Sequence, residues 1–139
     1  MSVLAKARAE DVIDVWEGIA NRPRYRRLRG PETGLVMMQA RAGGSGGKFN
    51  FGEITVTRCV VELDGGRTGH SYVAGSDFEH AEIAAVIDGL LRDDDGRAEI
   101  VDAVIEPLRR LQHNRRHATE AKSAATKVEF FTLVRGDNA

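Results

Sequence analysis

The sequence predicts a single α+β domain over residues 1–139, with a mostly antiparallel sheet of about four to five strands packed with about three helices. Helical apolar spacing occurs near the N-terminus and again in the second half, whereas β-branched stretches gather in the middle. A short glycine turn joins two of these stretches directly. Parallel neighbours would need a long crossover instead, so the strands are expected to run antiparallel.

Residues 2–20 predict the first helix. Its apolar side chains recur at the spacing of one helix face: Val12, Ile13, Val15, Trp16 and Ile19. Asp11, Asp14 and Glu17 are expected to face water on the other side. Pro23 ends the helix, because the residue before a proline disfavours helical conformation.

Extended segments follow. Residues 24–30 are short and extended, Gly30-Pro31-Glu32 is turn-like, and residues 33–41 predict a strand. Apolar residues on both faces of that strand favour a central, covered position. After the glycine loop, residues 49–64 are rich in β-branched side chains, and within them Val60 points away from the side shared by Cys59, Val61 and Leu63.

The chain then turns back on itself. Asp64-Gly65-Gly66 predicts a tight hairpin, since glycine tolerates the positive φ that such turns need, and residues 69–75 form the partner strand. Ser76 to Glu79 reads as a capping box, in which the Ser76 side chain accepts from the Glu79 N–H. One buried stripe marks the helix that follows: Ile83, Val86, Ile87, Leu90 and Leu91.

A second helical pattern runs from Ile100 to Leu111, and Pro107 is expected to kink or restart it. Residues 112–126 are polar nearly all round, which fits either a solvated continuation or an arm facing a partner. Residues 127–135 predict a last strand, and residues 136–139 a short polar tail.

Composition narrows the class of protein. The chain is 42% hydrophobic and 29% charged with a net charge of -1, so no overall field recruits nucleic acid or an anionic membrane. Its one cysteine cannot form an internal disulfide, and neither a signal peptide nor a stretch long enough to span a membrane is present. These features predict a soluble, cytoplasmic protein with no membrane or nucleic-acid partner.

The glycine loop, residues 43–47 followed by Lys48, invites a phosphate-binding interpretation. A Walker loop needs a glycine where Ala42 stands and a Ser or Thr where Phe49 stands, and a strand follows instead of a helix. The dinucleotide pattern fails in the same way. Two readings remain: a plain connection between strands, or a loop that becomes ordered against a ligand or partner.

Basic and histidine-containing stretches give further candidates. The run from Arg22 to Arg29, with Tyr25 inside it, fits a nucleic-acid surface or a solvated, acid-paired face. His80 resembles a deaminase signature but lacks the downstream cysteines, so capping or packing of its helix is favoured. His113 and His117 share one helix face, yet no third metal ligand is evident.

Two residues within the β-branched region complete the survey. Cys59 is expected to be a buried small apolar group, and Arg58 must reach solvent, a carboxylate or a bound anion. No serine–histidine–acid order, carboxylate pair or cofactor fingerprint stands out. The residues alone therefore predict no catalytic residue, no metal site and no cofactor bound by this chain.

Three long stretches resemble one family. They are "PETGLVMMQARAGGSGGKFNFGEITVTR" (31–58), "GHSYVAGSDFEHAEIAAVIDGLL" (69–91) and "KVEFFTLVRGDNA" (127–139). All three are similar to PhnG, the G subunit of the bacterial carbon–phosphorus lyase core complex. Residues 1–30 and 92–126 add little to the resemblance.

The resemblance implies an accessory subunit that assembles with the H, I and J subunits, chiefly the I subunit. It implies transfer of an alkylphosphonate to the ribose C1′ of MgATP, with release of adenine, giving ribose 1-methylphosphonate 5-triphosphate. Glycosyl transfer is associated with the I subunit, and radical cleavage, with its iron–sulfur cluster and S-adenosylmethionine, with the J subunit. No catalytic residue carries over to this chain.

The hypothesis that follows is that the chain closes a partner's reaction site, because positioning and water exclusion are large catalytic terms. Residues expected to dock on the partner are Gly43, Gly44, Phe49, Phe51, Phe130, Arg135 and Asp137. Arg41, Lys48 and Arg58 are candidates for contact with substrate phosphates. The alternatives are a stand-alone phosphate- or nucleotide-binding domain and a nucleic-acid module using Arg22 to Arg29.

Overall fold

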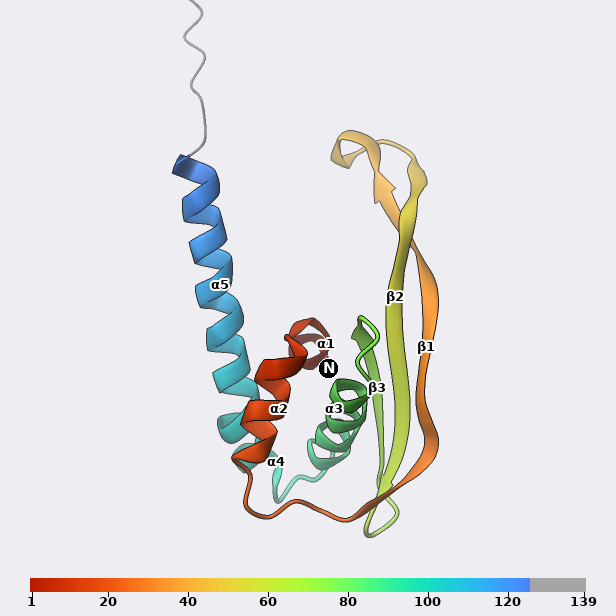
Figure 1. The fold of residues 1–139 in the computed structure, drawn as a ribbon, viewed down its shortest axis with the longest axis vertical. Coiled ribbons are helices and arrows are strands. Elements are labelled where there is room, and N and C mark those ends of the chain that lie inside the picture. The colour runs from red at the N-terminus through yellow and green to blue at the C-terminus, as the bar shows by residue number, and fades with distance from the viewer. Residues whose placement is uncertain (126–139) are drawn as a thin grey trace, which may run out of the picture.

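A computed structural model describes residues 1–125 of the chain (Figure 1). The predicted strand 127–135 and the tail 136–139, and with them Phe130, Arg135 and Asp137, lie outside the described residues. The elements are α1 (Ser2–Lys6), α2 (Ala9–Glu17), β1 (Tyr25–Arg41), β2 (Lys48–Leu63), β3 (Thr68–Ala74), α3 (Phe78–Leu90), α4 (Arg97–Ile100) and α5 (Glu106–Ala125).

The sheet is antiparallel, in the order β1-β2-β3. This confirms the α+β class, but residues 1–125 hold three strands instead of the predicted four to five. The expected turn at Gly30-Pro31-Glu32 was wrong, because β1 runs straight through it with shifts of register against β2. β1 is an edge strand, where a proline without an N–H donor is tolerated, and this joins two predicted segments into one.

The predicted first helix is two helices. Ala7 and Arg8 have extended backbone angles, which separate α1 from α2. The break lets α1 fold back over the core, where Leu4 is fully buried and its carbonyl oxygen accepts a hydrogen bond from His80 Nε2 at 2.9 Å. Asp11 was expected to face water but is buried, because its carboxylate is paired with Arg115 of α5.

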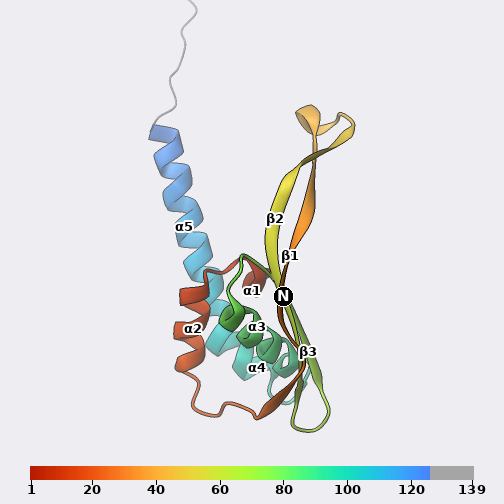
Figure 2. The same ribbon diagram turned by 45° about the vertical axis from the view of Figure 1, so that its right-hand side comes forward.

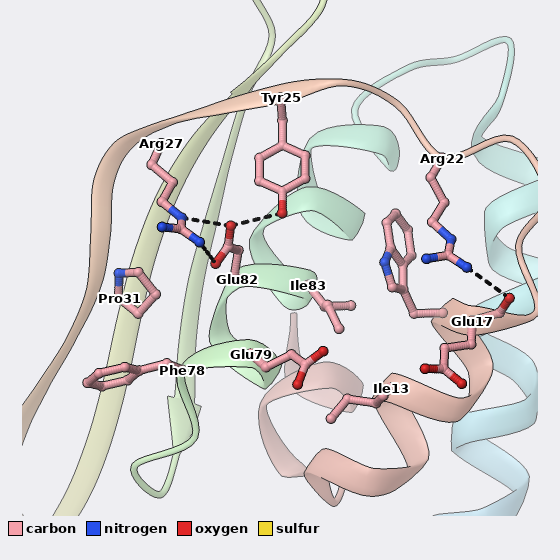
Figure 3. Close-up of a pocket in the computed structure, with 11 residues that line it drawn as sticks. Ile13, Glu17, Arg22, Tyr25, Arg27, Pro31, Phe78, Glu79, Glu82 and Ile83 are labelled. Carbon is pink, nitrogen blue, oxygen red and sulfur yellow. Dashed lines mark hydrogen bonds and ion pairs between the residues drawn. The ribbon is translucent and has the colours of Figure 1, made fainter.

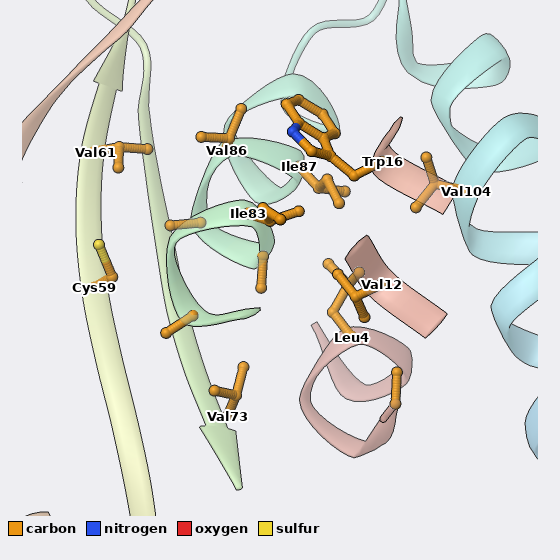
Figure 4. Packing of buried hydrophobic residues seen from close by; sticks show 14 of the residues in the cluster. Leu4, Val12, Trp16, Cys59, Val61, Val73, Ile83, Val86, Ile87 and Val104 are labelled. Carbon is orange, nitrogen blue, oxygen red and sulfur yellow. The ribbon is translucent and has the colours of Figure 1, made fainter. Parts of the chain in front are cut away.

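The hydrophobic core lies between the sheet and the helices (Figure 4). Cys59 and Val61 of β2 lie on the same side of the strand, as predicted, where they project toward α3 and are fully buried. Ile87 of α3 is also fully buried, and α3 in turn packs against α2, whose Trp16 reaches the same core. Of the predicted stripe, Ile83, Val86 and Ile87 are buried as expected, whereas Leu90 and Leu91 are only partly buried. The burial of α3 also extends beyond one stripe, to residues 80–87 and Gly89.

Helix α3 approaches β3 closely because two glycines meet. A Cβ on Gly69 would lie 1.9 Å from the Ala85 carbonyl oxygen, and one on Gly89 would lie 2.7 Å from a Leu63 methyl carbon. The N-cap of α3 is Asp77, whose side chain accepts from the His80 N–H at 2.7 Å. The predicted Ser76 cap was therefore displaced by one residue, since Asp77 offers a carboxylate at the first turn.

The last helical segment contains an irregular turn. A π-helical turn over Val101–Ile105 joins α4 to α5, directly before Pro107. Proline has no N–H for the preceding turn, so an irregularity is expected at this position and the predicted kink or restart is confirmed. α5 then continues as helix to Ala125, and its second half is exposed.

Two elements extend beyond the packed body in the same direction (Figures 1 and 2). One is α5, and the other is the far half of the β1–β2 hairpin. The last β2–β3 pair is Val56 with Ala74, so residues 35–54 form a two-stranded hairpin without a third strand. We call residues 35–54 the arm.

Candidate functional site

The arm exposes large apolar side chains. Six of the twelve large hydrophobic residues that are exposed in residues 1–125 belong to it: Leu35, Met37, Met38, Phe49, Phe51 and Ile54. Leu35 is 66% exposed and Phe51 is 70% exposed. The predicted strand 33–41 is confirmed as part of β1, but its central, covered position was wrong, because β1 is an edge strand and these residues are exposed or only half-buried. Such a concentration of apolar surface is typical of a site that contacts another molecule.

The arm's backbone explains the position of Phe51. The register changes between Met38 and Gln39, so that Met38 pairs with Gly52 and Gln39 pairs with Asn50. Phe51 is the extra residue of this bulge, and bulges redirect side chains near functional sites. The most exposed aromatic side chain of the described residues thus stands at an irregularity of the strand.

The glycine loop is the tip of the arm. Ala42–Gly44 form a 3₁₀ turn in which Gly43 and Gly44 have positive φ angles of 58° and 80°. The Gly46 N–H donates to the Ala42 carbonyl at 2.8 Å, and a Cβ on Gly46 would clash with that oxygen at 2.6 Å. Here the glycines shape a closed turn, which favours the strand connection over a phosphate-cradling loop.

The three candidate phosphate ligands do not come together within the chain. Arg41 and Lys48 are cross-strand partners beside the tip, and Arg41 Nη1 donates to the Gly46 carbonyl at 3.2 Å. Arg58 lies ten residues from Lys48 along β2, which corresponds to about 33 Å in a strand. It forms an ion pair with Glu32 at 3.2 Å. Arg58 therefore reaches a carboxylate, one of the three predicted outcomes.

A cavity of about 520 Å³ opens at the other end of β1, between α2, α3 and the start of the strand (Figure 3). Its wall carries Glu82 of α3, whose side chain is only 12% exposed. Arg27 binds both oxygens of this carboxylate at 2.8 Å, and the Tyr25 hydroxyl donates to Oε1 at 2.8 Å. This network ties β1 to α3.

Electrostatics in this cavity follow from the same contacts. Desolvation by burial acts to raise the pKa of Glu82, but the hydrogen bonds from Arg27 and Tyr25 outweigh it and lower that pKa below its ordinary value. Desolvation, together with the hydrogen bond to Glu82, raises the pKa of Tyr25 to about 12. Glu82 is therefore an ionised, fully bonded carboxylate, suited to holding strand to helix.

Other residues around this cavity make local contacts. Arg22 donates to the carbonyl oxygens of Ile19 at 3.2 Å and Glu17 at 3.1 Å, and its guanidinium lies 6.0 Å from the Trp16 ring centroid. The side chains of Glu17 and Glu79 also face this space (Figure 3).

The arginine run is mostly acid-paired. Arg26 pairs with Glu62, Arg27 with Glu82 and Arg29 with Glu32. The pairing confirms the predicted solvated, acid-paired face, and it leaves little unbalanced charge for a nucleic acid.

The remaining predicted residues have structural surroundings. His113 and His117 share a face of α5, with ring centroids 4.2 Å apart. No group of three or more His, Cys, Asp or Glu side chains that could hold a metal ion occurs in residues 1–125. Cys59 is buried as predicted, and desolvation raises the pKa of its thiol. His80 packs against α1, as expected.

Sequence reasoning missed the ion pairs that hold the elements together. Glu82 stands in the otherwise apolar run "AEIAAVI", and that position was a signal that its carboxylate needed a partner. Its partner Arg27 is 55 residues away, and Arg115 is 104 residues from Asp11. Nothing local in the sequence could identify such pairs.

Fold and site together define the class: an α+β protein with a three-stranded antiparallel sheet in residues 1–125 and a projecting apolar hairpin. The model of the family described as "Phosphonate metabolism protein PhnG" matches residues 1–136. The chain belongs to this family, as the resemblance of its three long stretches indicated.

A curated relative supports the same assignment. It is named alpha-D-ribose 1-methylphosphonate 5-triphosphate synthase subunit PhnG and comes from Rhizobium meliloti (strain 1021). The two chains are 39% identical over 138 residues, which cover 99% of this chain and 88% of the relative.

None of the helices in residues 1–125 combines the length and the apolar composition that a membrane span requires.

Proposed function

We propose that this chain is an accessory subunit of a ribose 1-methylphosphonate 5-triphosphate synthase, and that its arm docks on a catalytic partner subunit. The observation that carries the proposal is the group of exposed apolar side chains on residues 35–54. Family membership and the relative named as a synthase subunit support it. The partners are the H, I and J subunits, chiefly the I subunit.

In the proposed reaction, an oxygen of the alkylphosphonate forms a bond to C1′ of the ribose of MgATP. The bond between C1′ and the adenine base breaks, and adenine leaves with the bonding electron pair and a proton. Water is a competing nucleophile at the same carbon. A subunit that closes the site increases the fraction of turnovers that use phosphonate, without supplying a reacting group.

The arm suits this role for a physical reason. A two-stranded hairpin alone is marginally stable in water, and burying its apolar side chains on a partner stabilises both at about 25 cal/mol per Å². Leu35 and Phe51 are the largest exposed contributors. The partner is therefore expected to present an apolar groove to the arm.

Co-purification with the I subunit tests the proposal. We expect Leu35→Asp and Phe51→Asp each to reduce the amount of I subunit recovered with this chain by about tenfold or more, because a buried unpaired carboxylate is costly. Leu28→Asp is a matched control: Leu28 is also on β1 and 48% exposed, but it lies outside the arm. Recovery that is unchanged in the arm variants, or reduced equally in Leu28→Asp, would contradict docking through the arm.

Synthesis by the reconstituted complex is the second measurement. The arm variants should release relatively more free ribose 5-triphosphate from ATP and less phosphonate ester than the wild type. An unchanged ratio of the two products, despite loss of the subunit, would show that this chain does not exclude water from the site.

A further inference from the structure

A basic concavity lies where α5 passes the link between α1 and α2. It is an open concavity of about 500 Å³. Six of its lining side chains are basic: Lys6, Arg8, Arg109, His113, Arg115 and Arg116. The seventh is Gln112, so no carboxylate lines it, although the whole chain has a net charge of -1. We call these seven residues the basic groove.

The groove has a fixed frame. Gln112 Nε2 donates to the Val3 carbonyl oxygen at 2.7 Å, which holds α5 against α1. Arg115 pairs with Asp11, with Nη2 and Oδ1 2.8 Å apart, and so holds α5 against α2. The Asp11 side chain is only 11% exposed, and the hydrogen bond from Arg115 lowers its pKa. These two contacts position the groove, whereas the other basic side chains are available to a ligand.

In the free chain, three arginines of the groove form only exposed ion pairs. Arg8 pairs with Glu10, Arg109 with Glu106 and Arg116 with Glu120, all at exposed positions. Exposed pairs of this kind contribute little to stability, so a multiply charged anion can draw these guanidiniums away from their carboxylates at little cost. Lys6 has no carboxylate within ion-pair distance among residues 1–125.

The spacing indicates what kind of anion fits. Arg109, His113 and Arg116 recur at i, i+4 and i+7, so they line one face of α5 over about 10 Å. Guanidinium forks match phosphate oxygens geometrically, and arginines outnumber the single lysine here. A short oligophosphate concentrates several negative charges within such a length. The volume also falls in the range of small-molecule sites, about 300–1,000 Å³.

We propose that the basic groove binds an oligophosphate chain, such as the triphosphate carried by a nucleotide or by the product of the synthase. The choice of the triphosphate source rests on the proposed function; the groove itself rests on its own side chains. It lies on different elements from Arg41, Lys48 and Arg58, which are carried by the hairpin.

Calorimetric titration of the full chain with inorganic triphosphate at low salt tests this site. The groove variant is Arg109→Glu with Arg116→Glu, which leaves the ion pair between Arg115 and Asp11 intact. We expect it to weaken binding by about tenfold or more, because two charge-assisted hydrogen bonds to the anion are replaced by repulsion. Circular dichroism checks that the variant is folded.

Two control variants carry the same change in net charge elsewhere. Arg110→Glu with Lys122→Glu alters α5 outside the groove, and Arg41→Glu with Lys48→Glu alters the tip of the arm. We expect both to change the affinity less than about threefold, through the general field alone. Equal weakening in the α5 control, loss of binding only in the tip variant, or no binding of triphosphate by the wild type would overturn the proposal.

The nature and source of the anion are separated by further titrations. Triphosphate should bind more tightly than orthophosphate and should not be displaced by a hexaglutamate peptide. Displacement by the peptide would instead assign the groove to an acidic protein segment and overturn the oligophosphate assignment. Binding of ATP and ribose 5-triphosphate is compared directly, and equal affinity would locate recognition in the phosphates.

This test is independent of docking through the arm. A groove variant that still co-purifies with the I subunit but no longer binds triphosphate supports the groove proposal. A wild-type chain that binds triphosphate but never co-purifies with the I subunit contradicts only the accessory-subunit proposal.

Discussion

The two halves of β2 pair with the same strand but have different surroundings. In the body, Val61 and Leu63 lie against α3 and are buried, whereas in the arm Phe51 and Ile54 are exposed. Both halves carry aromatic or β-branched residues, and both pair with β1. What differs is the neighbour: β3 and α3 cover only the second half. Burial of a strand therefore depends on what packs against it.

The comparison has an energetic consequence. The body buries its apolar side chains within the chain, so its stability does not depend on another molecule. The arm leaves apolar surface in water, so part of the free energy it can gain is realised only when another molecule covers it. The predictions below separate these two sources of stability.

Amide hydrogen exchange should show the largest difference between the two regions. Body amides such as those of Val61 and Val73 are expected to exchange only on global unfolding, whereas arm amides of the hydrogen-bonded pair Val36 and Ile54 exchange through local opening. Protection should differ by about 100-fold or more. Equal protection in the free chain would contradict the division, and addition of the I subunit should raise protection in the arm alone.

A pair of glycine substitutions gives the next largest effect. Gly69→Ala should lower the free energy of unfolding by about 3 kcal/mol or more, because its Cβ would overlap the Ala85 carbonyl oxygen. Gly52→Ala, in the arm, meets nothing within 4 Å and should change stability by about 0.5 kcal/mol or less. Urea unfolding measures both. Equal losses would mean that the arm is packed as tightly as the body.

The smallest effect concerns pH and the network that joins β1 to α3. Because the folded pKa of Glu82 is lowered, its contribution is present above its unfolded pKa, about 4, and is lost as pH falls through the folded value. The difference in urea midpoint between the wild type and Glu82→Gln should therefore shrink on acidification below about pH 4. Leu35→Ala, in the arm, serves as the control and should show no such trend.

Tyr25 gives the opposite sign in the same network. Its pKa rises to about 12 on folding, so its contribution is complete below its unfolded pKa of about 10 and is lost as pH rises through about 12.

For Glu82 itself, a difference in urea midpoint between the wild type and Glu82→Gln that stayed constant from pH 3 to pH 8 would show that Glu82 is not held by these bonds.

Much of the fold could be predicted because its signals are local. The hairpin turn at Gly65 and Gly66, the buried stripe of α3 and the irregular turn before Pro107 each follow from neighbouring residues. The predicted turn at Pro31 divided β1 into two segments and so raised the predicted number of strands. Whether a proline interrupts a strand depends on whether that strand lies at the edge of the sheet. The prediction of one continuous first helix was wrong for a similar reason. The break between α1 and α2 lets Leu4 enter the core and its carbonyl oxygen bond to His80, and both contacts are distant in sequence.

The candidate sites divide in the same way. Phe49, Phe51, Gly43 and Gly44 were predicted from the sequence to dock on a partner, and they lie together on the arm. Their docking role remains a proposal. Lys6 and Arg8 lie about a hundred residues from Arg109 and Arg116, so the sequence could not show that they line one groove. Charges separated so widely along the chain meet only through packing of helices.

By itself the sequence determined most of the segments that become helix or strand, the burial of Cys59 and of the apolar face of α3, and, through three long stretches, the family. Tertiary structure decided where the sheet is left uncovered and which distant charges meet. The physical reason is that periodicity and turn chemistry act between residues a few positions apart. Burial and ion pairing depend instead on which elements lie side by side: α3 covers one half of β2 and leaves the arm bare, and α5 brings its arginines to the N-terminal helices.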